Sequence, residues 1–358
     1  MNQASARAVV YFRIHDSTYP RNSRIRSALS SEYEVTCLAR VQGVHGPRKL
    51  IYESLGLWRA SRGARILVLS EFNLQYASVA WAIARLRGMT LVIDGFIGMY
   101  ETEVEDKKTV LPGSYPAKKY RFLDAVARRV ADYYLIDTEV RAREIVMRTR
   151  SKVFALPVGA PDWAVQHEPA NGHDEMRILY YGNYIELHGL DVLVPAVRRA
   201  SESRKIRFTL IGDGPSRAAV EAMTNNWPSG SRVVFLDPVP QEKLPKYIAE
   251  NDLVLGVFGS SLKSRSVIAN KVWQGLSSGR VVLTQVSPAM LEIEQIAGSA
   301  LVQVEASEEA IATALVGLDL LRVDRGELSA HLEDYVQMKF ERFLSAIRDV
   351  SPRSHWKF

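Results

Sequence analysis

The residues best suited to chemistry in this sequence combine serines, cations and amides directly after an apolar run. Residues 259–266 read Gly-Ser-Ser-Leu-Lys-Ser-Arg-Ser, and Asn270 and Lys271 then begin a predicted helix. A cation in the first turn of a helix opposes the helix dipole, at a cost of about 0.3–1 kcal/mol, unless an anion binds there. A phosphate group would meet free backbone amides together with Lys263, Arg265 and Lys271. The segment therefore favours a phosphate site over the alternative, a solvated loop without a ligand.

A second candidate is a glycine-containing turn after a predicted strand. The strand ends at Gly212, Asp213 and Gly214, and Pro215 suits the first turn of a following helix. Glycines in such a turn let the backbone approach a ligand, although a tight turn without a ligand explains them equally well. Arg217 stands where the dinucleotide fingerprint requires its third glycine, which argues against NAD binding.

A third candidate is the polar turn after the strand predicted at 176–181. It contains Gly182, Asn183 and Tyr184 and continues to His188. We expect a flexible turn at the mouth of a binding cleft. His188 either donates to a phosphate or caps a helix, and the sequence leaves both interpretations open.

Two clusters in the first half are weaker candidates. Residues 101–106 carry four carboxylates, which suit a hard cation, although a mobile charged loop over an acceptor cleft is the preferred interpretation. Arg13, His15 and Asp16 follow the first predicted strand, where their side chains would face the same cleft.

These candidates require a framework that brings several strand ends together. Short apolar runs alternate with amphipathic stretches along the whole chain, and this order predicts parallel sheets covered by helices on both faces. Ligands bind such sheets outside the carboxyl ends of the strands. The predicted strands are 6–14, 33–39, 65–70, 89–94, 133–137, 152–158, 176–182, 207–214, 232–237, 252–258, 280–285 and 300–304.

The pattern divides into two doubly wound, Rossmann-like domains that face each other across a cleft. The segment 158–174 is rich in Pro, Gly, Asn and His and lacks periodicity, as a linker does. The predicted parts are a first domain at 1–160, a linker at 161–174, a second domain at 175–324 and a helix at 325–358 that packs back across the junction.

Composition narrows the class of protein. Of 358 residues, 47% are hydrophobic and 24% charged, as in a globular protein, and the N-terminus does not have the pattern of a signal peptide. Cys37, the single cysteine, excludes an internal disulfide, fits a cytoplasmic protein and is expected to be buried at the end of a strand. The net charge of +6 favours an anionic partner, such as a lipid surface, and no RNA-binding or zinc signature points to nucleic acid. The basic residues of the first half cluster at Arg21, Arg24, Arg26, Lys118, Lys119, Arg121, Arg128 and Arg129.

Taken in order, several segments resemble the bacterial branch of the retaining GT-B glycosyltransferases known as family 4. In the second half the resemblance is carried by YGNYIELHG, LIGDGP, FLDPVPQEKLPKY before NDLVL, and NKVWQGLSSGRVVLT. In the first half it is carried by IDGFIGMYETEVEDKK and DYYLIDT. The order and spacing of these pieces are specific, whereas no single piece is.

The resemblance implies where a donor would lie. The turn at 212–215 matches a segment near the donor, and the backbone at Val239 matches the stretch that meets the nucleotide base. Two glutamates of the family, eight positions apart, are replaced by Ser266 and Gln274. The histidine that faces the sugar in the first domain is replaced by Asp94.

The diphosphate cations of the family are also missing from their usual turn. Asn183 and His188 hold those positions, so we expect Lys263 and Lys271 to supply the charge. We assign Lys263, Arg265 and Lys271 to the diphosphate, and Asn270 and Gln274 to the sugar or ribose. Asp94 would orient the transferred sugar or the acceptor hydroxyl.

The predicted activity is transfer of a sugar from a UDP- or GDP-sugar to a hydroxyl acceptor, such as a glycan or a lipid-linked saccharide. The resemblance implies retention of configuration, no metal and no cofactor beyond the donor. The predicted location is the cytoplasm, with peripheral contact to the inner face of the cell membrane as an extension. The alternatives are a nucleotide-sugar-binding pseudoenzyme that serves as a scaffold for another transferase, and a sugar-nucleotide epimerase.

Overall fold

The computed structural model describes residues 8–168, 174–320, 323 and 326–348. The chain forms two compact units. The first consists of the residues up to Val158 together with those from Val336 onward, and the second runs from Gly159 to Tyr335. Parts of the predicted linker (169–173) and of the predicted C-terminal helix (325 and 349–358) lie outside the described residues.

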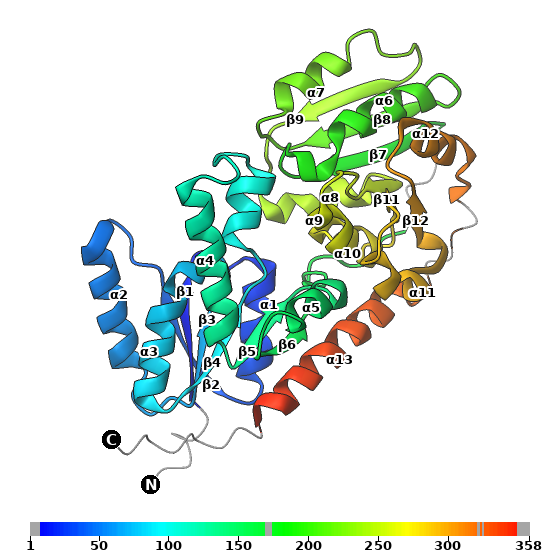
Figure 1. The fold of residues 1–358 in the computed structure, drawn as a ribbon. Coiled ribbons are helices and arrows are strands. Elements are labelled where there is room, and N and C mark those ends of the chain that lie inside the picture. Colours follow the sequence, from blue (N-terminus) through cyan, green and yellow to red (C-terminus); the bar gives the residue numbers. More distant parts are fainter. Residues whose placement is uncertain (1–7, 169–173, 321–322, 324–325, 349–358) are drawn as a thin grey trace. The chain divides into compact units, whose positions relative to one another are not determined.

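The first unit contains a parallel six-stranded sheet in the order β2-β1-β3-β4-β5-β6 (Figure 1). Its strands are β1 (Ala8–Ile14), β2 (Glu34–Ala39), β3 (Ile66–Leu69), β4 (Thr90–Asp94), β5 (Tyr133–Ile136) and β6 (Lys152–Ala155). Its helices are α1 (Pro20–Ser30), α2 (Gly46–Ala60), η2 (Leu74–Tyr76), α3 (Ala77–Arg87), the π-helix η3 (Glu101–Asp106), α4 (Tyr115–Val130) and α5 (Glu139–Val146).

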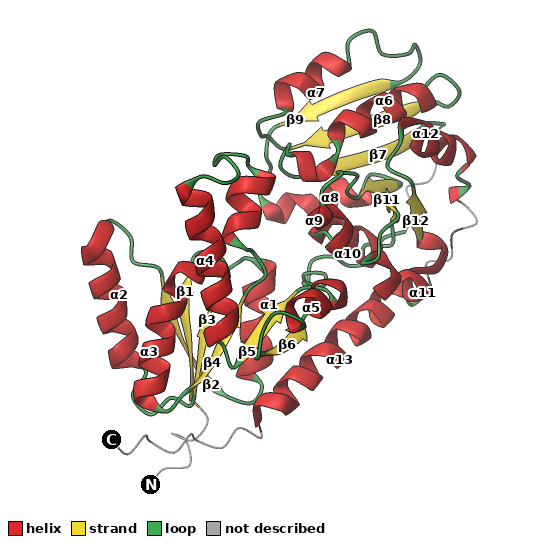
Figure 2. Ribbon diagram, viewed as in Figure 1, coloured by secondary structure: helices red, strands yellow, loops and turns green. Residues whose placement is uncertain are grey.

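Helices lie on both sides of this sheet (Figure 2). Val10 and Phe12 of β1 belong to a buried cluster with Leu57 of α2 and Ala80 of α3. The run ILVL of β3 is buried at every position, as expected for a strand covered on both faces.

A helix from late in the chain, α13 (Leu328–Arg348), completes the first unit. The ring of Phe343 lies 5.6 Å from that of Phe154 and 6.5 Å from that of Tyr133. Lys339 pairs with Glu139 of α5 at 2.5 Å. The first unit is therefore assembled from two segments that are far apart in the sequence.

The second unit contains a parallel six-stranded sheet in the order β12-β11-β10-β7-β8-β9. Its strands are β7 (Met176–Tyr181), β8 (Ile206–Ile211), β9 (Arg232–Leu236), β10 (Leu253–Leu255), β11 (Val281–Gln285) and β12 (Leu301–Val304). Its helices are η4 (Glu186–His188), α6 (Leu190–Ala200), α7 (Arg217–Met223), η5 (Gln241–Lys243), α8 (Leu244–Ala249), α9 (Leu262–Ser266), α10 (Asn270–Ser277), η6 (Met290–Glu292), α11 (Glu294–Ala297), η7 (Gly298–Ala300) and α12 (Glu308–Gly317).

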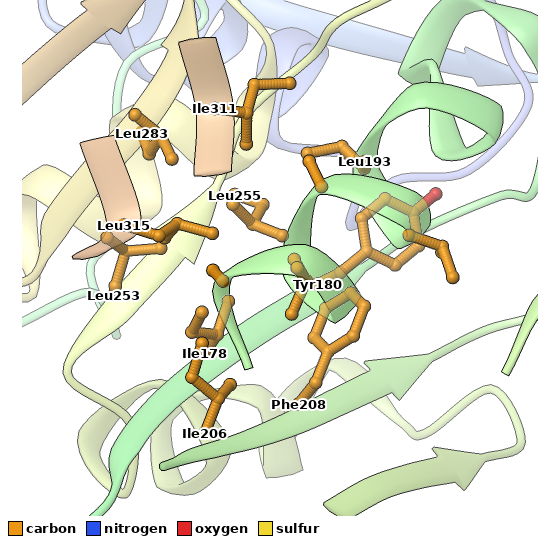
Figure 3. Close-up of a cluster of buried hydrophobic side chains, with 14 of the residues drawn as sticks. Ile178, Tyr180, Leu193, Ile206, Phe208, Leu253, Leu255, Leu283, Ile311 and Leu315 are labelled. Atoms are coloured by element: carbon orange, nitrogen blue, oxygen red, sulfur yellow. The ribbon is translucent and has the colours of Figure 1, made fainter. Parts of the chain in front are cut away.

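The core of the second unit lies between one face of this sheet and helices α6, α7 and α12. Figure 3 shows Ile178, Phe208 and Leu255 of the sheet together with Leu193 of α6 and Ile311 of α12. All five side chains are fully buried. Helix α10 covers the other face, where a side chain at Gly275 would collide with Val282 of β11 at 2.8 Å.

Each sheet has one point at which the strand order reverses. In the first unit the chain adds β2 on one side of β1 and β3 on the other, and in the second unit it adds β8 on one side of β7 and β10 on the other. In open α/β sheets, ligands bind at the carboxyl ends of the strands beside such a switch point. The two switch points, β1/β3 and β7/β10, are therefore the first places to look for a site.

The predicted α/β class with two Rossmann-like sheets is confirmed, and each predicted strand overlaps an observed one. Two local predictions are wrong. The loop expected at 259–266 contains the short helix α9, because Ser261 caps its first turn by accepting from the Ser264 amide. Cys37 is exposed rather than buried, since β2 is an edge strand whose residues are largely accessible.

Within the described ranges, no helix is both long and apolar enough to cross a membrane.

Candidate functional site

The turns after β7 and β8 pack backbone against backbone. Gly212 has φ +132°, and a Cβ there would lie 2.0 Å from the carbonyl oxygen of Gly182. A Cβ at Gly214 would lie 2.7 Å from the amide nitrogen of Tyr184, which donates to the carbonyl of Asp213 at 3.0 Å. The sequence left two explanations for these glycines, approach of the backbone to a ligand and a tight turn without a ligand. In the structure they open a path to the neighbouring turn, so their role as donor contacts stays a prediction.

The turn at 182–184 is packed and hydrogen-bonded in the structure, whereas the sequence predicted a flexible polar turn. Tyr184 is fully buried and its ring packs edge-on against Tyr180 at 5.5 Å, so its side chain belongs to the core. The carbonyl of Asn183 accepts hydrogen bonds from the Tyr180 hydroxyl and from the ring of His188. A donor would meet the backbone of this turn rather than the Tyr184 side chain.

His188 holds the turn at 182–184 in place through its ring nitrogen Nδ1. Its Nδ1 lies 2.5 Å from the carbonyl oxygen of Asn183 and 2.6 Å from the Tyr180 hydroxyl. Because a carbonyl only accepts, we assign the ring proton to Nδ1. Burial and the nearby Lys271 ammonium hold the pKa of His188 well below its usual range, so the ring is neutral. With its one N–H used by Asn183, His188 positions the turn and has no proton to donate to a phosphate.

Lys271 is the most unusual group at the β7/β10 switch point. It lies in the first turn of α10, and its Nζ is 4.2 Å from the centroid of the Tyr180 ring and 3.5 Å from where a Cβ of Gly182 would stand. The side chain is 4% exposed, and its ammonium has no hydrogen-bond partner among the described residues. Burial lowers the pKa of Lys271 to about 7.

A buried, unpaired ammonium is costly, because its lost hydration is not replaced by an opposite charge. An anion at the carboxyl end of β7 would replace that hydration and would also interact with the N-terminal end of α10. The position and the missing charge together fit the diphosphate of a nucleotide.

The loops on the two sides of the switch point are bonded to each other. The amides of Phe258 and Gly259 donate to the carbonyls of His188 and Leu187, both at 3.1 Å. Gly189 has φ +65°, and a Cβ there would lie 2.4 Å from the backbone carbonyl of Phe258. The loop that leads to Lys271 is thus fixed directly to the turn that would face a phosphate.

The other predicted phosphate cations have different environments. Lys263 is buried and makes an interaction of its own within the chain, whereas Arg265 is exposed. Ser266 donates to the carbonyl of Lys263 at 3.2 Å, closing the short helix α9. Joint binding of one phosphate by Lys263, Arg265 and Lys271 stays a prediction, and Lys271 is the member that the structure singles out.

The amide candidates lie on α10 beside Lys271. The hydroxyl of Tyr181 donates to Oε1 of Gln274 at 2.7 Å, and both side chains are buried. This bond fixes the orientation of the Gln274 amide and directs its donor group, the NH₂, toward any hydroxyl partner. Asn270, the first residue of α10, is half-buried.

The segment expected to meet a nucleotide base lies after β9. Val239 is half-buried between the exposed Pro238 and Pro240. Its backbone N–H and C=O make no hydrogen bond with any part of the chain that the structure describes. Both groups are thus available to a base edge.

Asp94, the candidate of the first unit, is committed to a buried ion pair. It is fully buried at the end of β4, and both of its oxygens accept from Arg21 at 2.9–3.0 Å. Oδ1 also accepts from the amide of Phe96 at 3.2 Å. In this arrangement the Asp94 carboxylate binds Arg21 and not a ligand, which corrects the expectation that it faces a sugar; a part in transfer stays a prediction.

The Arg13 cluster is likewise paired within the chain. Arg13 adopts φ +68°, an unfavourable conformation for a side chain larger than glycine, and its guanidinium bonds Glu53 at 2.8 Å and Asn73 at 2.5 Å. It also lies 3.6 Å from the centroid of the Tyr76 ring. His15 and Asp16 are exposed. The strain and the pairing fix the β1/β3 switch point.

Glu71 is a functional candidate that the sequence interpretation missed. It follows β3 directly, is 1% exposed, and its Oε1 accepts from Asn22 at 2.7 Å. Its Oε2 has no partner in the described chain, and burial together with Asp94 raises the pKa of Glu71 to about 7. An acidic residue immediately after a buried strand was the signal that would have revealed it.

The acidic stretch at 101–106 forms the π-helix η3 and is partly neutralised by cations. Glu101 pairs with Arg141 and Glu103 with Lys107, each at 2.8 Å. Across the residues that the structure describes, no group of three or more His, Cys, Asp or Glu is placed to hold a metal ion.

Comparisons with known proteins agree with this geometry. Residues 175–319, which lie within the second unit, match the family model described as "Glycosyl transferases group 1". Comparison with curated protein sequences finds no match.

Solved glycosyltransferases share the fold of the whole chain. The Anabaena protein HepE, crystallised in complex with UDP, aligns with a TM-score of 0.69 and 10% identity over 96% of this chain and 100% of its own. The lipopolysaccharide outer core galactosyltransferase WaaB aligns with a TM-score of 0.63 and 14% identity over 95% and 98%. A glycosyltransferase from Rickettsia africae aligns with a TM-score of 0.64 and 10% identity over 97% and 99%. The chain therefore has the two-domain α/β fold of GT-B glycosyltransferases.

Proposed function

We propose that the protein transfers a sugar from a nucleoside-diphosphate sugar to a hydroxyl acceptor. The observation that carries this proposal is the buried, unpaired Lys271 at the β7/β10 switch point. The site lies inside the segment that matches the glycosyl transferases group 1 model, which supports the same activity.

Sugar transfer from a nucleoside-diphosphate sugar requires a fixed positive charge next to the leaving group. When the bond between sugar and diphosphate breaks, negative charge grows on the diphosphate, and a cation held in a dry site stabilises that charge without first having to reorganise. Lys271 is held in such a site by Tyr180 and by the turn at 182–184. A bound diphosphate raises the pKa of Lys271 again and keeps the side chain protonated.

The remaining donor contacts follow the resemblance of the sequence motifs. We assign the backbone of Val239 to the base, and Gln274 and Asn270 to the ribose or sugar hydroxyls. The UDP bound in HepE supports uridine diphosphate as the donor nucleotide, with guanosine diphosphate as the alternative. Retention of configuration, independence from metal and membership of the bacterial branch of family 4 rest on the resemblance of the sequence motifs.

The acceptor is a glycan or lipid-linked saccharide, and we propose that the protein works in the cytoplasm against the inner membrane face. Helix α2 supports membrane contact, because five large side chains of its 15 residues are at least 38% exposed next to basic ones. These exposed residues are Leu50, Ile51, Tyr52, Leu55 and Trp58, and Arg48 and Lys49 precede them. Apolar and cationic side chains on one helix suit an anionic lipid surface.

The donor site is tested by calorimetric titration of UDP, GDP, ADP and TDP into the wild type and Lys271→Met. One nucleotide should bind, and Lys271→Met should weaken it by about tenfold or more, the loss expected for one charge-assisted hydrogen bond. The matched control is Lys246→Met on α8, whose side chain is 77% exposed, and it should bind as the wild type does. Equal affinity in Lys271→Met and the wild type would remove the proposal.

Turnover separates transfer from the alternatives. With a sugar nucleotide and an acceptor extract, a transferase releases the nucleoside diphosphate, and Lys271→Met releases much less. A scaffold protein binds the nucleotide without releasing product, and an epimerase changes the sugar nucleotide with no acceptor present. Either of those results contradicts the transferase.

A further inference from the structure

A second polar pocket lies entirely within the first unit. It has a volume of about 440 Å³ and is bordered by η3, α4 and α5 at the carboxyl ends of β4 and β5. Four arginines from α4, α5 and the segment after α5 line it: Arg121, Arg128, Arg141 and Arg148. Neither the sequence motifs nor the donor site accounts for this concentration of arginine.

One of the four arginines is fully engaged by the protein. Arg141 donates to the carbonyl of Phe96 at 3.1 Å and pairs with Asp137 and Glu101, each at 2.8 Å. Arg141 therefore forms part of the pocket wall and is not available to a ligand.

The other three arginines have no carboxylate partner among the described residues. Arg121 donates to the hydroxyl of Tyr100 at 2.8 Å and lies 4.2 Å from the centroid of its ring. The guanidinium groups of Arg128 and Arg148 make neither a hydrogen bond nor an ion pair within the described chain. Three cations thus border one pocket without a close ion pair in the part of the chain that the structure describes.

The carboxylates around the pocket form no ion pair with these three arginines among the described residues. Both oxygens of the buried Asp124 accept backbone amides, from Met99 at 2.9 Å and Tyr100 at 3.0 Å, and Glu101 is paired with Arg141. Burial raises the pKa of Asp124, and the positive charge of the nearby Arg128 acts in the opposite direction. Glu105 and Glu144 are solvent-exposed.

A hydroxyl donor lies at the wall of the pocket. Tyr134 is 2% exposed, lines the pocket, and makes no hydrogen bond in the part of the chain described here. Burial raises the pKa of Tyr134, so the hydroxyl keeps its proton and can donate it to an anion. Its ring occupies the space beside Gly95, where a Cβ would lie 1.9 Å from the ring, so only glycine fits at that position.

We propose that this pocket binds the phosphate group of a phosphorylated acceptor, through Arg128, Arg148 and Arg121 with the Tyr134 hydroxyl as a fourth donor. Guanidinium groups bind phosphate oxygens through paired N–H groups, and a neutral hydroxyl adds a donor without adding charge. The acceptor part of the statement rests on the proposed function, whereas the phosphate site does not. The phosphate belongs either to a soluble sugar phosphate or to a lipid headgroup.

The test measures phosphate binding separately from the donor site. Inorganic phosphate, glucose 1-phosphate and glycerol 3-phosphate are titrated calorimetrically into Lys271→Met, in which the cation of the donor site is absent. In that background Arg128→Gln should weaken binding of all three probes by about tenfold or more. The matched control is Arg129→Gln, the neighbouring and exposed arginine of α4, which should leave the affinity unchanged.

The outcomes are distinct from those of the donor test. Tyr134→Phe, which removes one donor and keeps the ring, should weaken phosphate binding without changing UDP affinity in the otherwise wild-type protein. If glycerol 3-phosphate binds more tightly than glucose 1-phosphate, the natural ligand is a lipid headgroup. If glucose 1-phosphate binds more tightly, the natural ligand is a sugar phosphate. Absence of phosphate binding, or an equal loss of phosphate affinity in Arg128→Gln and Arg129→Gln, overturns the proposal that this pocket binds phosphate. UDP binding remains measurable in either case, so one proposal can fail while the other stands.

Discussion

The two switch points of this protein share a topology and differ in how their charges are neutralised. At β1/β3 in the first unit, Arg21 pairs with Asp94 and Arg13 pairs with Glu53, and all four side chains are buried. At β7/β10 in the second unit, Lys271 is just as buried, yet its ammonium has no partner in the described chain.

The difference shows that strand order determines where a site lies, whereas the side chains determine whether its buried charges are neutralised within the fold or by a ligand. Buried ion pairs hold the first switch point together without help, because each charge finds its opposite within the fold. The second switch point keeps a charge for which only a ligand can provide the opposite. We expect the first to respond to mutation mainly through stability and the second mainly through binding.

The largest effect is expected when a pair of the first switch point is broken. Arg21→Ala leaves the Asp94 carboxylate buried without its cation, which should lower the free energy of unfolding by about 3–5 kcal/mol. Denaturant unfolding measures this loss. The double variant Arg21→Met with Asp94→Leu removes both charges and should be less destabilised than the single one. An equal or larger loss of stability in the double variant would show that the unpaired Asp94 carboxylate is not the cause of the destabilisation.

A smaller loss of stability is expected when a side chain is placed between the two turns of the second unit that follow β7 and β8. Gly212→Ala places a Cβ 2.0 Å from the Gly182 carbonyl, so we expect a loss of about 3 kcal/mol from strain and displaced backbone. Gly230→Ala is the matched control, since its φ of +86° is also positive but its Cβ would meet nothing within 4 Å. It should cost about 1 kcal/mol. Similar losses in both would mean that backbone conformation, and not the contact of the turns, is decisive.

The lysine of the second switch point should make stability depend on pH. Burial lowers its pKa from 10.5 to about 7, so between these values the unfolded chain binds more protons than the folded one. The free energy of unfolding contributed by Lys271 therefore rises as pH increases above 7, by about 2 kcal/mol at most between pH 7 and 9. Lys271→Met should lack this rise and be the more stable protein at pH 7 in the absence of nucleotide. Parallel pH curves for the two proteins would contradict the buried charge.

Glu71 at the first switch point should show the opposite slope, with an effect of about the same size. Its pKa is raised from 4.5 to about 7, so the folded chain binds more protons between these values. Its contribution is fully present below pH 4.5 and is lost as pH rises through 7, by about 2–3 kcal/mol between pH 5 and pH 8. Glu71→Gln should remove that slope in urea unfolding series at pH 5 and pH 8. A variant that still loses stability in step with the wild type would assign the slope to another group.

The sequence predicted most of the fold because the relevant signals are local. Runs such as ILVL at 66–69 and VVLTQ at 281–285 mark buried parallel strands wherever they occur, and the helices between them follow from spacing. Lys271 could be selected for a similar reason, since a cation in the first turn of a helix is unfavourable by itself.

The errors arose where a residue's role depends on a partner far away in the sequence. Asp94 reads as an exposed polar group at a strand end, and only the fold brings Arg21, 73 positions earlier, onto both of its oxygens. The glycines at 212 and 214 left open whether their space serves a ligand, and only the parallel register of β7 and β8 brings the turn at 182–184 into that space. Contacts of this kind have no periodic signature in the sequence.

The first unit contains two segments that are far apart in the sequence, and this determines when its folding can be completed during protein synthesis. Its sheet leaves the ribosome early, but Phe343 and Lys339, which pack on β5, β6 and α5, are translated only after the entire second unit. Nascent domains usually fold as they emerge, from the N-terminus onward. Here we expect Tyr133 and Phe154 to stay without the packing of Phe343 until α13 has been translated.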